Sequence, residues 1–432
     1  MKKLKRILLL LLVFCMVFST SLKVLAETDN PGGGTTQNQP FSSNTGGSTY
    51  FRIPALVTLN DGTLVASADA RWSGSGDAGG IDTIVSRSTD GGNAWSYSFA
   101  NYLGDNDMQF NTNCATFIDP SMATDGSNTI YMLVDLFVAG YAINTAPKLP
   151  LTGLGFNNQG KLIVRESSTD SSTYSNYSYY VGDYGDNGYA LIYDSTNTAV
   201  DGYKVDRWFN LYQNDTKISN LFYADGAYQA YPTTYLYLTK STDGGVTWGA
   251  PTLLNVKNDG EMFYGVGPGS ALVTSTGRII FACYKYPDEY TSVIYSDDNG
   301  VTWTRSANMS ANSSEATMAE VSGRIYMFTR HGGYYVSEDN GTNWSEQKSM
   351  GISYNTGCQL SAIKYSQKID GKDAIILSAP ASTSSRSTGT LFVALINSDG
   401  TLDWKYSYQV TDGSYAYSSM SEMEDGNIAL LY

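Results

Sequence analysis

Histidine and cysteine are scarce in this chain of 432 residues. The only histidine is His331, which argues against a zinc site built from several histidine ligands. Four cysteines are present, and they have neither the spacing of a disulfide framework nor that of a metal site: Cys15, Cys114, Cys283 and Cys358. We therefore expect no metal ion and no disulfide scaffold, and a chain of this length can form a large core without them.

Basic residues are in the minority, with 27 Lys and Arg against 41 Asp and Glu and a formal net charge of −14. Five of the basic residues lie within positions 1–26, so the rest of the chain is more acidic still. Such a chain repels nucleic acid and anionic membrane surfaces. It should also repel an anionic ligand, unless several arginines are gathered at one place.

Long apolar runs are also missing, because the run at 7–18 is too short for a good membrane span. Basic residues precede this run, and small or apolar residues follow it up to Ala26, which is typical of a cleaved signal peptide at 1–26. An uncleaved N-terminal anchor is the alternative. Residues 27–48 are rich in Gly, Thr, Asn and Ser, which predicts a flexible linker. We expect a secreted protein without a membrane span after cleavage.

Amphipathic helical patterns are absent, and short apolar alternations such as 130–134 and 235–238 are bounded by Asp-Gly and Asn-Gly turns instead. The 34 tyrosines fit this pattern, because aromatic side chains suit β-strands. The sequence therefore predicts an all-β fold.

A short motif recurs around the pattern S-x-D-x-G-x-T-W, known as the Asp-box, at 88–95, 241–248, 296–303 and 337–344. A fifth, degenerate copy lies at 397–404. The Asp side chain can accept hydrogen bonds from the backbone of its own turn, the Gly permits positive φ, and the Trp can pack under the hairpin. Each copy closes one hairpin, so the repeat predicts recurring blades and marks the fold, not the chemistry.

The spacing of the boxes is uneven. The spacing from Asp243 to Asp298, and from Asp298 to Asp339, is about the length of one blade. The stretch from Asp90 to Asp243 is far longer. Within that stretch, residues 142–234 are rich in Tyr, Asn, Asp and Ser. We therefore predict a small β-domain at 142–234, inserted between blades of a domain that spans 49–432.

The segment Phe-Arg-Ile-Pro at 51–54, together with the Asp-boxes downstream, resembles the non-viral, bacterial-type sialidases, also called neuraminidases. The resemblance covers nearly all of the chain from about residue 48. It implies a six-bladed β-propeller and an exo-α-sialidase that needs no cofactor. Members of the family run on past the Leu-Leu-Tyr segment that ends at Tyr432, so we expect the last blade to be incomplete.

The first half of the chain carries four residues to which the resemblance assigns roles. Arg52 of the Phe-Arg-Ile-Pro segment would bind the substrate carboxylate, and Arg71, in Asp-Ala-Arg, would contact the sugar's 4-hydroxyl. Asp77, in the Gly-rich loop 76–80, would be the general acid/base, with Asp82 as the alternative. Asp119, in Ile-Asp-Pro, would contact the sugar.

The second half carries the other roles that the resemblance implies. Tyr284, in the strand predicted at 279–286, would line the pocket beside Tyr286. Glu315, in Ser-Glu-Ala-Thr-Met-Ala-Glu, would be the partner of the nucleophile.

The remaining three residues that the resemblance assigns are two arginines and the nucleophile. Arg330, in Phe-Thr-Arg, and Arg386, in Ser-Arg-Ser-Thr-Gly-Thr, would be the second and third carboxylate-binding arginines. Tyr417, in Ser-Tyr-Ala-Tyr-Ser-Ser, would be the nucleophile, with Tyr415 as the alternative.

This set of residues makes chemical sense for sialic acid, which carries a carboxylate on the reacting carbon. Three guanidinium groups would supply planar, charge-assisted hydrogen bonds and reverse the local sign of an acidic protein. A neutral phenol approaches that carboxylate more easily than an anionic nucleophile would, and two displacements imply retention of configuration. The expected partners are sialylated glycoproteins, glycolipids or oligosaccharides, bound by a monomer.

Three other functions stay open. Release of 2,7-anhydro-sialic acid by intramolecular trans-sialidase chemistry would differ only in the second acceptor. A non-catalytic Asp-box propeller that binds sialoglycans would lack some catalytic positions. Another glycoside hydrolase would use paired carboxylates and would not need three arginines.

Overall fold

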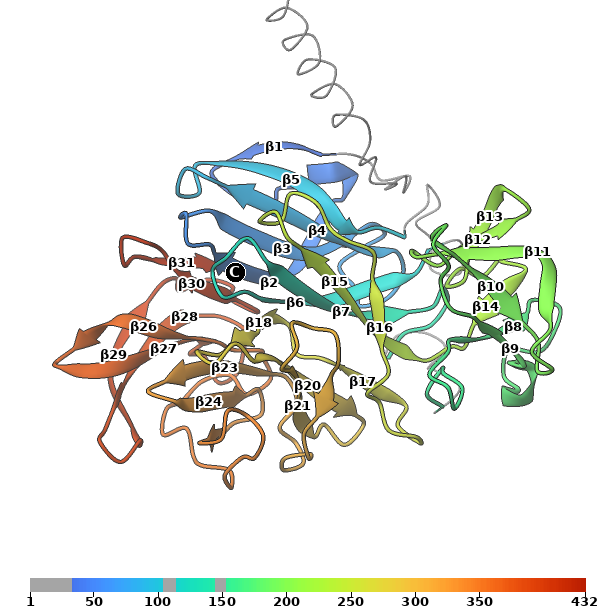
Figure 1. Ribbon diagram of the computed structural model, residues 1–432. Helices are drawn as coiled ribbons and strands as arrows, with labels where there is room; N and C mark the ends of the chain where they lie inside the picture. Colours follow the sequence, from blue (N-terminus) through green and yellow to red (C-terminus); the bar gives the residue numbers. More distant parts are fainter. Residues whose placement is uncertain (1–32, 104–113, 144–152) are drawn as a thin grey trace, which may run out of the picture. The chain divides into compact units, whose positions relative to one another are not determined.

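The computed structural model describes residues 33–103, 114–143 and 153–432. The predicted signal peptide at 1–26 and the start of the predicted linker lie outside these ranges. The described chain is almost entirely β, with only two three-residue 3-10 helices, Thr45–Gly47 and Tyr174–Asn176, so the predicted all-β class is confirmed (Figure 1). No helix in the described part of the chain is both long and apolar enough to cross a membrane.

Four antiparallel strands that follow one another in the chain begin the fold: β2 (Tyr50–Thr58), β3 (Leu64–Arg71), β4 (Ile81–Ser88) and β5 (Ala94–Asn101). A further strand, β1 (Gly34–Gln37), pairs with the outer edge of β5. The prediction that residues 27–48 form a flexible linker is therefore wrong for β1 and Ser48. The backbone of β1 is hydrogen-bonded to that of β5, and Ser48 is fully buried.

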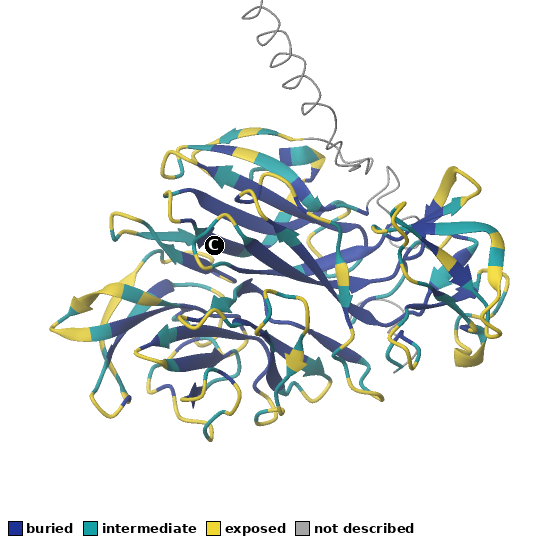
Figure 2. Ribbon diagram, viewed as in Figure 1, coloured by how far each residue is buried: buried dark blue, intermediate teal, exposed yellow. Residues whose placement is uncertain are grey.

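The next four strands also form an antiparallel sheet: β6 (Thr116–Ala123), β7 (Ile130–Phe137), β15 (Thr234–Ser241) and β16 (Thr252–Leu254). Strand β7 is buried along its whole length, as is β3 (Figure 2). Because β7 pairs directly with β15, the chain between them is an insertion into this sheet. The insertion therefore lies between two paired strands of one sheet, whereas the sequence analysis placed it between successive repeats.

The insertion forms a sheet of its own, in the order β13-β12-β11-β10-β9-β8-β14, drawn in green in Figure 1. Its buried residues, among them Val164, Ile192 and Leu211, belong to one hydrophobic cluster with Met132 and Val134 of β7. The inserted sheet is thus packed onto the sheet that it interrupts. Its strands are Ile163–Glu166, Tyr179–Val181, Tyr189–Tyr193, Ala199–Asp206, Asn210–Gln213, Thr216–Asn220 and Tyr228–Ala230.

Four further sheets complete the described chain. One contains β17 (Phe263–Val266), β19 (Leu272–Val273), β20 (Ile279–Tyr286), β21 (Thr291–Ser296) and β22 (Thr304–Arg305). The second contains β23 (Ala316–Val321), β24 (Arg324–Thr329) and β25 (Tyr334–Ser337). The third contains β26 (Ser361–Ile369), β27 (Lys372–Pro380), β28 (Gly389–Ile396) and β29 (Leu402–Gln409). The fourth contains β30 (Ser419–Glu422) and β31 (Ile428–Leu431).

Six strands contact one another in a closed cycle. Strand β2 contacts β6, and β6 pairs in parallel with the short strand β18 (Gly269–Ser270). Strand β18 contacts β23, β23 contacts β26, β26 contacts β30, and β30 returns to β2. These six strands therefore form one central arrangement, to which the other strands of the sheets are added.

The four Asp-boxes occupy the same place in their sheets, at the turns that follow β4, β15, β21 and β25, and the degenerate copy follows β28. In the third box, Oδ1 of Asp298 accepts the backbone N–H groups of Val301 (3.1 Å) and Thr302 (2.8 Å). The N–H of Gly300, which has a φ of 85°, donates to the Ser296 hydroxyl at 2.9 Å. The predicted turn chemistry is confirmed.

Two bulges carry predicted site residues at the other end of the strands. The pairing of β2 with β3 shifts by one residue after Arg52, and that of β6 with β7 shifts after Ile118. Each bulge contains a residue with positive φ directly before a proline, Ile53 at 60° and Asp119 at 64°. Since proline cannot donate to a ladder and disfavours the right-handed helical region before it, both strands bend at the same motif.

Candidate functional site

Tyr417, Glu315 and Arg330 come together at the ends of three different elements. Tyr417 precedes β30, Glu315 precedes β23 and Arg330 follows β24. The phenol of Tyr417 donates to the Glu315 carboxylate, at 2.7 Å from Oε1 and 2.9 Å from Oε2. Nη1 of Arg330 donates to the Tyr417 oxygen at 3.0 Å and lies 3.1 Å from Oε2 of Glu315. A phenol, a carboxylate and a guanidinium therefore form one closed network.

Burial raises the pKa of Tyr417 well above its usual range, and the negative charge of Glu315 adds to this while Arg330 opposes it. The phenol is therefore neutral at rest and needs a base to ionise. Glu315 is 4% exposed and contacts the phenol through both oxygens, so its carboxylate is the base in reach.

Arg386 lies beside Arg330, and the two guanidinium groups share one acceptor. Nη2 of Arg330 donates to the Gly357 carbonyl at 2.9 Å, and Nη2 of Arg386 donates to the same oxygen at 2.8 Å. Their central carbons lie 6.0 Å and 5.4 Å from the centre of the Tyr417 ring. Two cations thus flank the phenol, where an anionic ligand would bind.

Arg52, Arg71 and Asp77 form a second network. Oδ1 of Asp77 accepts hydrogen bonds from Nη1 of Arg52 at 2.8 Å and from Nη1 of Arg71 at 2.6 Å. Arg71 is fully buried and also donates to Oδ2 of Asp69 at 2.7 Å. Burial acts to raise the pKa of Asp77, but the two guanidinium groups outweigh it and lower that pKa. Asp77 is therefore an ionised carboxylate in this arrangement.

The two networks meet through apolar contacts. Ile53, which follows Arg52, lies in one buried cluster with Tyr417 and Cys358, and Cys358 follows Gly357. The N–H of Asp119 donates to Oδ1 of Asp69 at 3.2 Å.

Asp119 and Tyr284 also lie within the electrostatic reach of the network around Tyr417. The pKa of Asp119 is raised well above its usual value, first by burial and then by Asp69 and Glu315. Burial raises the pKa of Tyr284, and the charges of Glu315 and Asp119 add to it. The structure thus brings all nine predicted site residues into one region.

The two alternative residues have other partners. Oδ2 of Asp82 accepts the Trp72 indole N–H at 2.7 Å, and Oδ1 accepts the Leu103 N–H at 2.8 Å, with the side chain fully buried. The Tyr415 hydroxyl contacts that of Ser378, and its ring lies where a side chain on Gly389 would be. Both are tied into the interior, so Asp77 and Tyr417 are the members of each pair that face the charged groups.

Asp135 on β7 is a buried acid that the sequence analysis missed. Its Oδ1 accepts the Val266 N–H at 2.9 Å, and Oδ2 has no partner among the described residues. Burial raises its pKa well above the usual value. A Cβ on Gly265 would lie 2.3 Å from Oδ2, so glycine is required there. An acid inside an otherwise apolar run, Ile130–Phe137, was the signal that could have found it.

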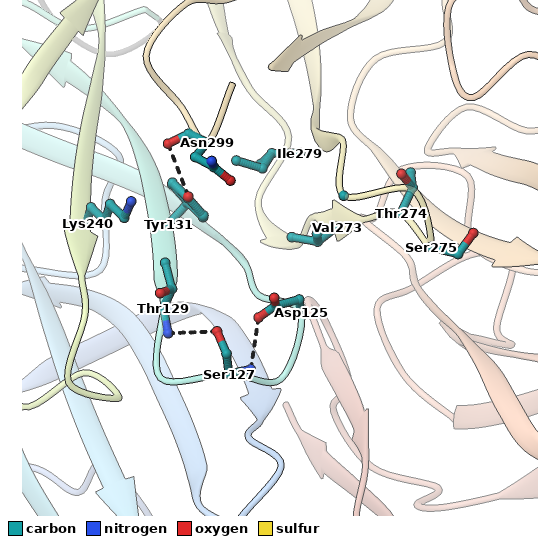
Figure 3. A pocket seen from close by; sticks show the side chains of 11 residues that line it. Asp125, Ser127, Thr129, Tyr131, Lys240, Val273, Thr274, Ser275, Ile279 and Asn299 are labelled. Carbon is teal, nitrogen blue, oxygen red and sulfur yellow. Dashed lines mark hydrogen bonds between the residues drawn. The ribbon is translucent and has the colours of Figure 1, made fainter. Parts of the chain in front are cut away.

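A cavity of about 630 Å³ lies elsewhere, lined mainly by residues of the segments 125–131 and 273–279 (Figure 3). Tyr131 lines it and donates to the backbone oxygen of Asn299, a residue of the third box, at 3.1 Å. Lys240 stands over the Tyr131 ring at 4.9 Å. None of the predicted site residues lines this cavity, so its size does not identify the chemistry, and the converging charges around Tyr417 are the better guide.

Within the ranges that the structure describes, no three His, Cys, Asp or Glu side chains are grouped so that they could hold a metal ion. Cys114, Cys283 and Cys358 are all buried. Burial raises the pKa of Cys358 to about 11, so this thiol beside Tyr417 is not poised as a nucleophile.

Comparisons with known proteins agree with this arrangement. The family model of the BNR repeat-like domain matches residues 210–430. The chain is 32% identical to the anhydrosialidase of Macrobdella decora and 33% identical to sialidase B of Streptococcus pneumoniae, covering 89% of this chain in both cases and 58% and 61% of those proteins. It thus spans about three-fifths of the length of these two curated relatives.

One solved structure matches this chain over most of the length of both proteins. The intramolecular trans-sialidase from Ruminococcus gnavus, in complex with oseltamivir carboxylate, is 31% identical to this chain, with a TM-score of 0.78. The match covers 89% of this chain and 90% of that one. With its Asp-box turns and the network around Tyr417, the chain belongs to the bacterial-type sialidase family of BNR-repeat proteins.

Proposed function

We propose that this protein is an exo-α-sialidase that removes terminal sialic acid from glycoproteins, glycolipids or oligosaccharides with retention of configuration. The observation that carries the proposal is the Tyr417 phenol, hydrogen-bonded to Glu315 and flanked by Arg330 and Arg386. A buried phenol–carboxylate pair between two guanidinium groups fits attack on a carbon that itself bears a carboxylate.

The substrate carboxylate would be bound by Arg52, Arg330 and Arg386. Arginine suits this role because its planar guanidinium presents parallel N–H donors to a carboxylate. Arg71, Asp119 and Tyr284 would contact the sugar ring. These last roles rest on the family resemblance and on the position of the side chains around the two networks.

The reaction would proceed in two displacements. The Tyr417 oxygen attacks the anomeric carbon and gives its proton to Glu315, while Asp77 protonates the departing glycosidic oxygen. In the second step Asp77 takes a proton from water as that water attacks the same carbon. The bond to Tyr417 breaks, and Glu315 returns the proton to the phenolate. Two inversions at one carbon give net retention.

Asp77 must carry a proton before the first step, whereas its contacts with Arg52 and Arg71 favour the ionised form. A bound substrate would change this balance, because its carboxylate engages Arg52 and brings a negative charge close to Asp77. Both effects raise the pKa of Asp77. Substrate binding would therefore convert Asp77 into the acid that the reaction needs.

The proposed architecture is a six-bladed β-propeller over 49–432, with the inserted small β-domain within the range 142–234. Its support is the recurrence of the Asp-box turn along the chain and the closed cycle of six strands, β2, β6, β18, β23, β26 and β30. We also propose export and action as a monomer outside the cell, supported by the basic and apolar pattern of residues 1–26.

A second candidate is the intramolecular reaction, in which a hydroxyl of the sugar replaces water as the second acceptor and 2,7-anhydro-sialic acid is released. The observation behind it is the likeness to the anhydrosialidase of Macrobdella decora and to the intramolecular trans-sialidase from Ruminococcus gnavus. Both reactions share the first displacement at Tyr417.

One assay tests the proposal and separates the alternatives. Purified protein is incubated with a fluorogenic aryl sialoside, and the sugar product is weighed by mass spectrometry. Free sialic acid supports the hydrolase, and a product lighter by one water supports the intramolecular route. Binding without turnover would instead indicate a non-catalytic sialoglycan-binding protein, and neither binding nor turnover would refute the sialic-acid assignment.

A further inference from the structure

The only histidine of the chain lies at the rim of the candidate site, directly after Arg330. Nε2 of His331 lies 2.6 Å from Oε2 of Glu289, in the loop between β20 and β21. Nδ1 lies 3.1 Å from the backbone oxygen of Thr356, in the segment before β26. One imidazole thus joins three loops that come from three different sheets.

The hydrogen bonds of His331 fix the donor at one ring nitrogen. A carbonyl oxygen only accepts, so Nδ1–H donates to Thr356. The Nε2 atom is in contact with the Glu289 carboxyl at 2.6 Å, a hydrogen-bond distance. The ring is therefore anchored at both edges.

Glu289 is itself anchored to the network around Tyr417. Its backbone oxygen accepts the N–H groups of Ser313 at 2.9 Å and Ser314 at 2.8 Å, directly before Glu315. Glu289 has a φ of 51°, so the loop holds it in a left-handed conformation that presents the carbonyl to this turn and the carboxylate to His331. The position of His331 is thus tied to the position of Glu315.

We call the contacts of His331 with Glu289 and Thr356 the bridge. At its Thr356 end, the bridge holds the segment that carries a hydrogen-bond acceptor shared by two arginines. Thr356, held by His331, is followed by Gly357, whose carbonyl accepts Nη2 of both Arg330 and Arg386. If the segment at Thr356 moved, this oxygen would move with it and both guanidinium groups would lose their common partner. The geometry of the arginine pair therefore depends on the bridge.

We propose that His331 and Glu289 are positioning residues that pre-organise Arg330 and Arg386 for the substrate carboxylate. The inference rests on the proposed sialidase function. Neither residue touches the reacting atoms; both act through the Gly357 carbonyl. An exposed ion pair without this connection would contribute little to stability and nothing to substrate binding.

The kinetic test compares His331→Phe, Glu289→Gln and the double variant with the wild type on an aryl sialoside. Because the arginines bind the ground state as well as the transition state, we expect His331→Phe to raise KM about tenfold while kcat changes by less than about threefold. Glu289→Gln should act in the same direction. The double variant should be no worse than the single one, because both break the same bridge.

Glu338→Gln is the control, since Glu338 also pairs with a basic residue, Arg324 at 2.9 Å, but at an Asp-box turn. We expect this variant to keep the wild-type KM. The thermal midpoint of each variant is measured in parallel. If the bridge is only structural, His331→Phe lowers the midpoint and leaves KM unchanged, and that result overturns the proposal.

A second readout uses the fact that the chain has one imidazole. Its NMR signal is unique, so titration with free sialic acid should shift the His331 resonance saturably in the wild type and fail to do so in Arg386→Met. A resonance that stays fixed while sialic acid binds would overturn the proposal. A wild type that neither cleaves sialosides nor binds sialic acid would instead refute the proposed function, and the bridge's role with it.

Discussion

The Asp-box turns and the candidate site lie at opposite ends of the same strands and are built in opposite ways. Strand β4 begins near Asp77 and ends at the first box, and β21 begins near Glu289 and ends at the third. Each Asp-box carboxylate bonds to residues no more than four positions away, as Asp298 does. The bond from Tyr417 to Glu315 joins residues 102 positions apart. The Asp-box turns are therefore determined by neighbouring residues, whereas the candidate site forms only after the sheets have assembled.

The carboxyl groups at the two ends are also tuned in opposite directions. The side chain and backbone of Thr302 lower the pKa of Asp298 to about 2, because both donate to its ionised form. Burial raises the pKa of Asp119 in the site, and the neighbouring acids add to it. Charge at the turns stabilises local structure, whereas charge in the site is held at a cost that the arginines offset.

The largest expected effect is at the site. Tyr417→Phe removes the nucleophilic oxygen and leaves the ion pair between Glu315 and Arg330 in place. We expect turnover of an aryl sialoside to fall by at least about 10³-fold while the thermal midpoint changes little. Kinetics together with a melting curve check this.

Tyr415→Phe is the control for that variant, because it removes a buried hydroxyl two residues away that contacts Ser378. This change should lower the thermal midpoint and keep most of the turnover. If Tyr415→Phe is inactive and Tyr417→Phe is not, the nucleophile is Tyr415.

The next effect concerns the anionic ligand. Arg386→Met removes a cation whose side chain donates to the backbone carbonyl of Gly357 and to no other group among the described residues, so the fold should tolerate the change. Loss of one arginine–carboxylate contact should cost roughly 2–5 kcal/mol, which lowers kcat/KM by about 30-fold to several thousand-fold. Steady-state kinetics measure it, and an unchanged kcat/KM would remove Arg386 from the site.

A smaller effect is expected at the turns. Asp243→Ala removes the acceptor of the Val246 and Thr247 N–H groups, at 3.1 Å and 2.9 Å. The free energy of unfolding should fall by about 1 kcal/mol, with KM and kcat unchanged. Denaturant unfolding measures the free energy of unfolding, and the sialoside assay measures KM and kcat. A loss of activity at wild-type stability would show that the two ends are coupled.

The smallest effect is one of pH. The folded pKa of Asp298, about 2, is below the unfolded value, so its ionisation stabilises the fold above the unfolded pKa. This contribution is lost as pH falls from about 4 through the folded value. The thermal midpoint of the wild type should therefore exceed that of Asp298→Asn at pH 5, and the gap should narrow towards pH 2.5. A constant gap would contradict the assignment.

The same contrast explains how much the sequence could predict. The box turns and the strand-rich fold follow from neighbouring residues, so their pattern was sufficient. Tyr417 and Arg386 could be predicted as site residues because family motifs surround them. The role of β1 was missed, because only its pairing with β5, which no local signal announces, makes it a strand.

The contacts that complete the site were missed for the same physical reason. The Gly357 carbonyl and the His331–Glu289 pair have no motif, and their partners lie between 25 and 42 positions away in the chain. The insertion was recognised by composition, but its place between β7 and β15 depends on which strands pair. Contacts between neighbouring residues can thus be predicted from the sequence, whereas the pairing of strands that are distant in the chain cannot.

The central claim is that Tyr417 forms the covalent bond to the sugar. A fluorinated sialosyl fluoride, which forms the first intermediate quickly and releases it slowly, is incubated with the protein, and the labelled peptide is identified by mass spectrometry. The account predicts a sialosyl adduct on Tyr417 that is absent from Tyr417→Phe. An adduct on a carboxylate such as Asp77 or Glu315, or turnover without any adduct, would contradict it.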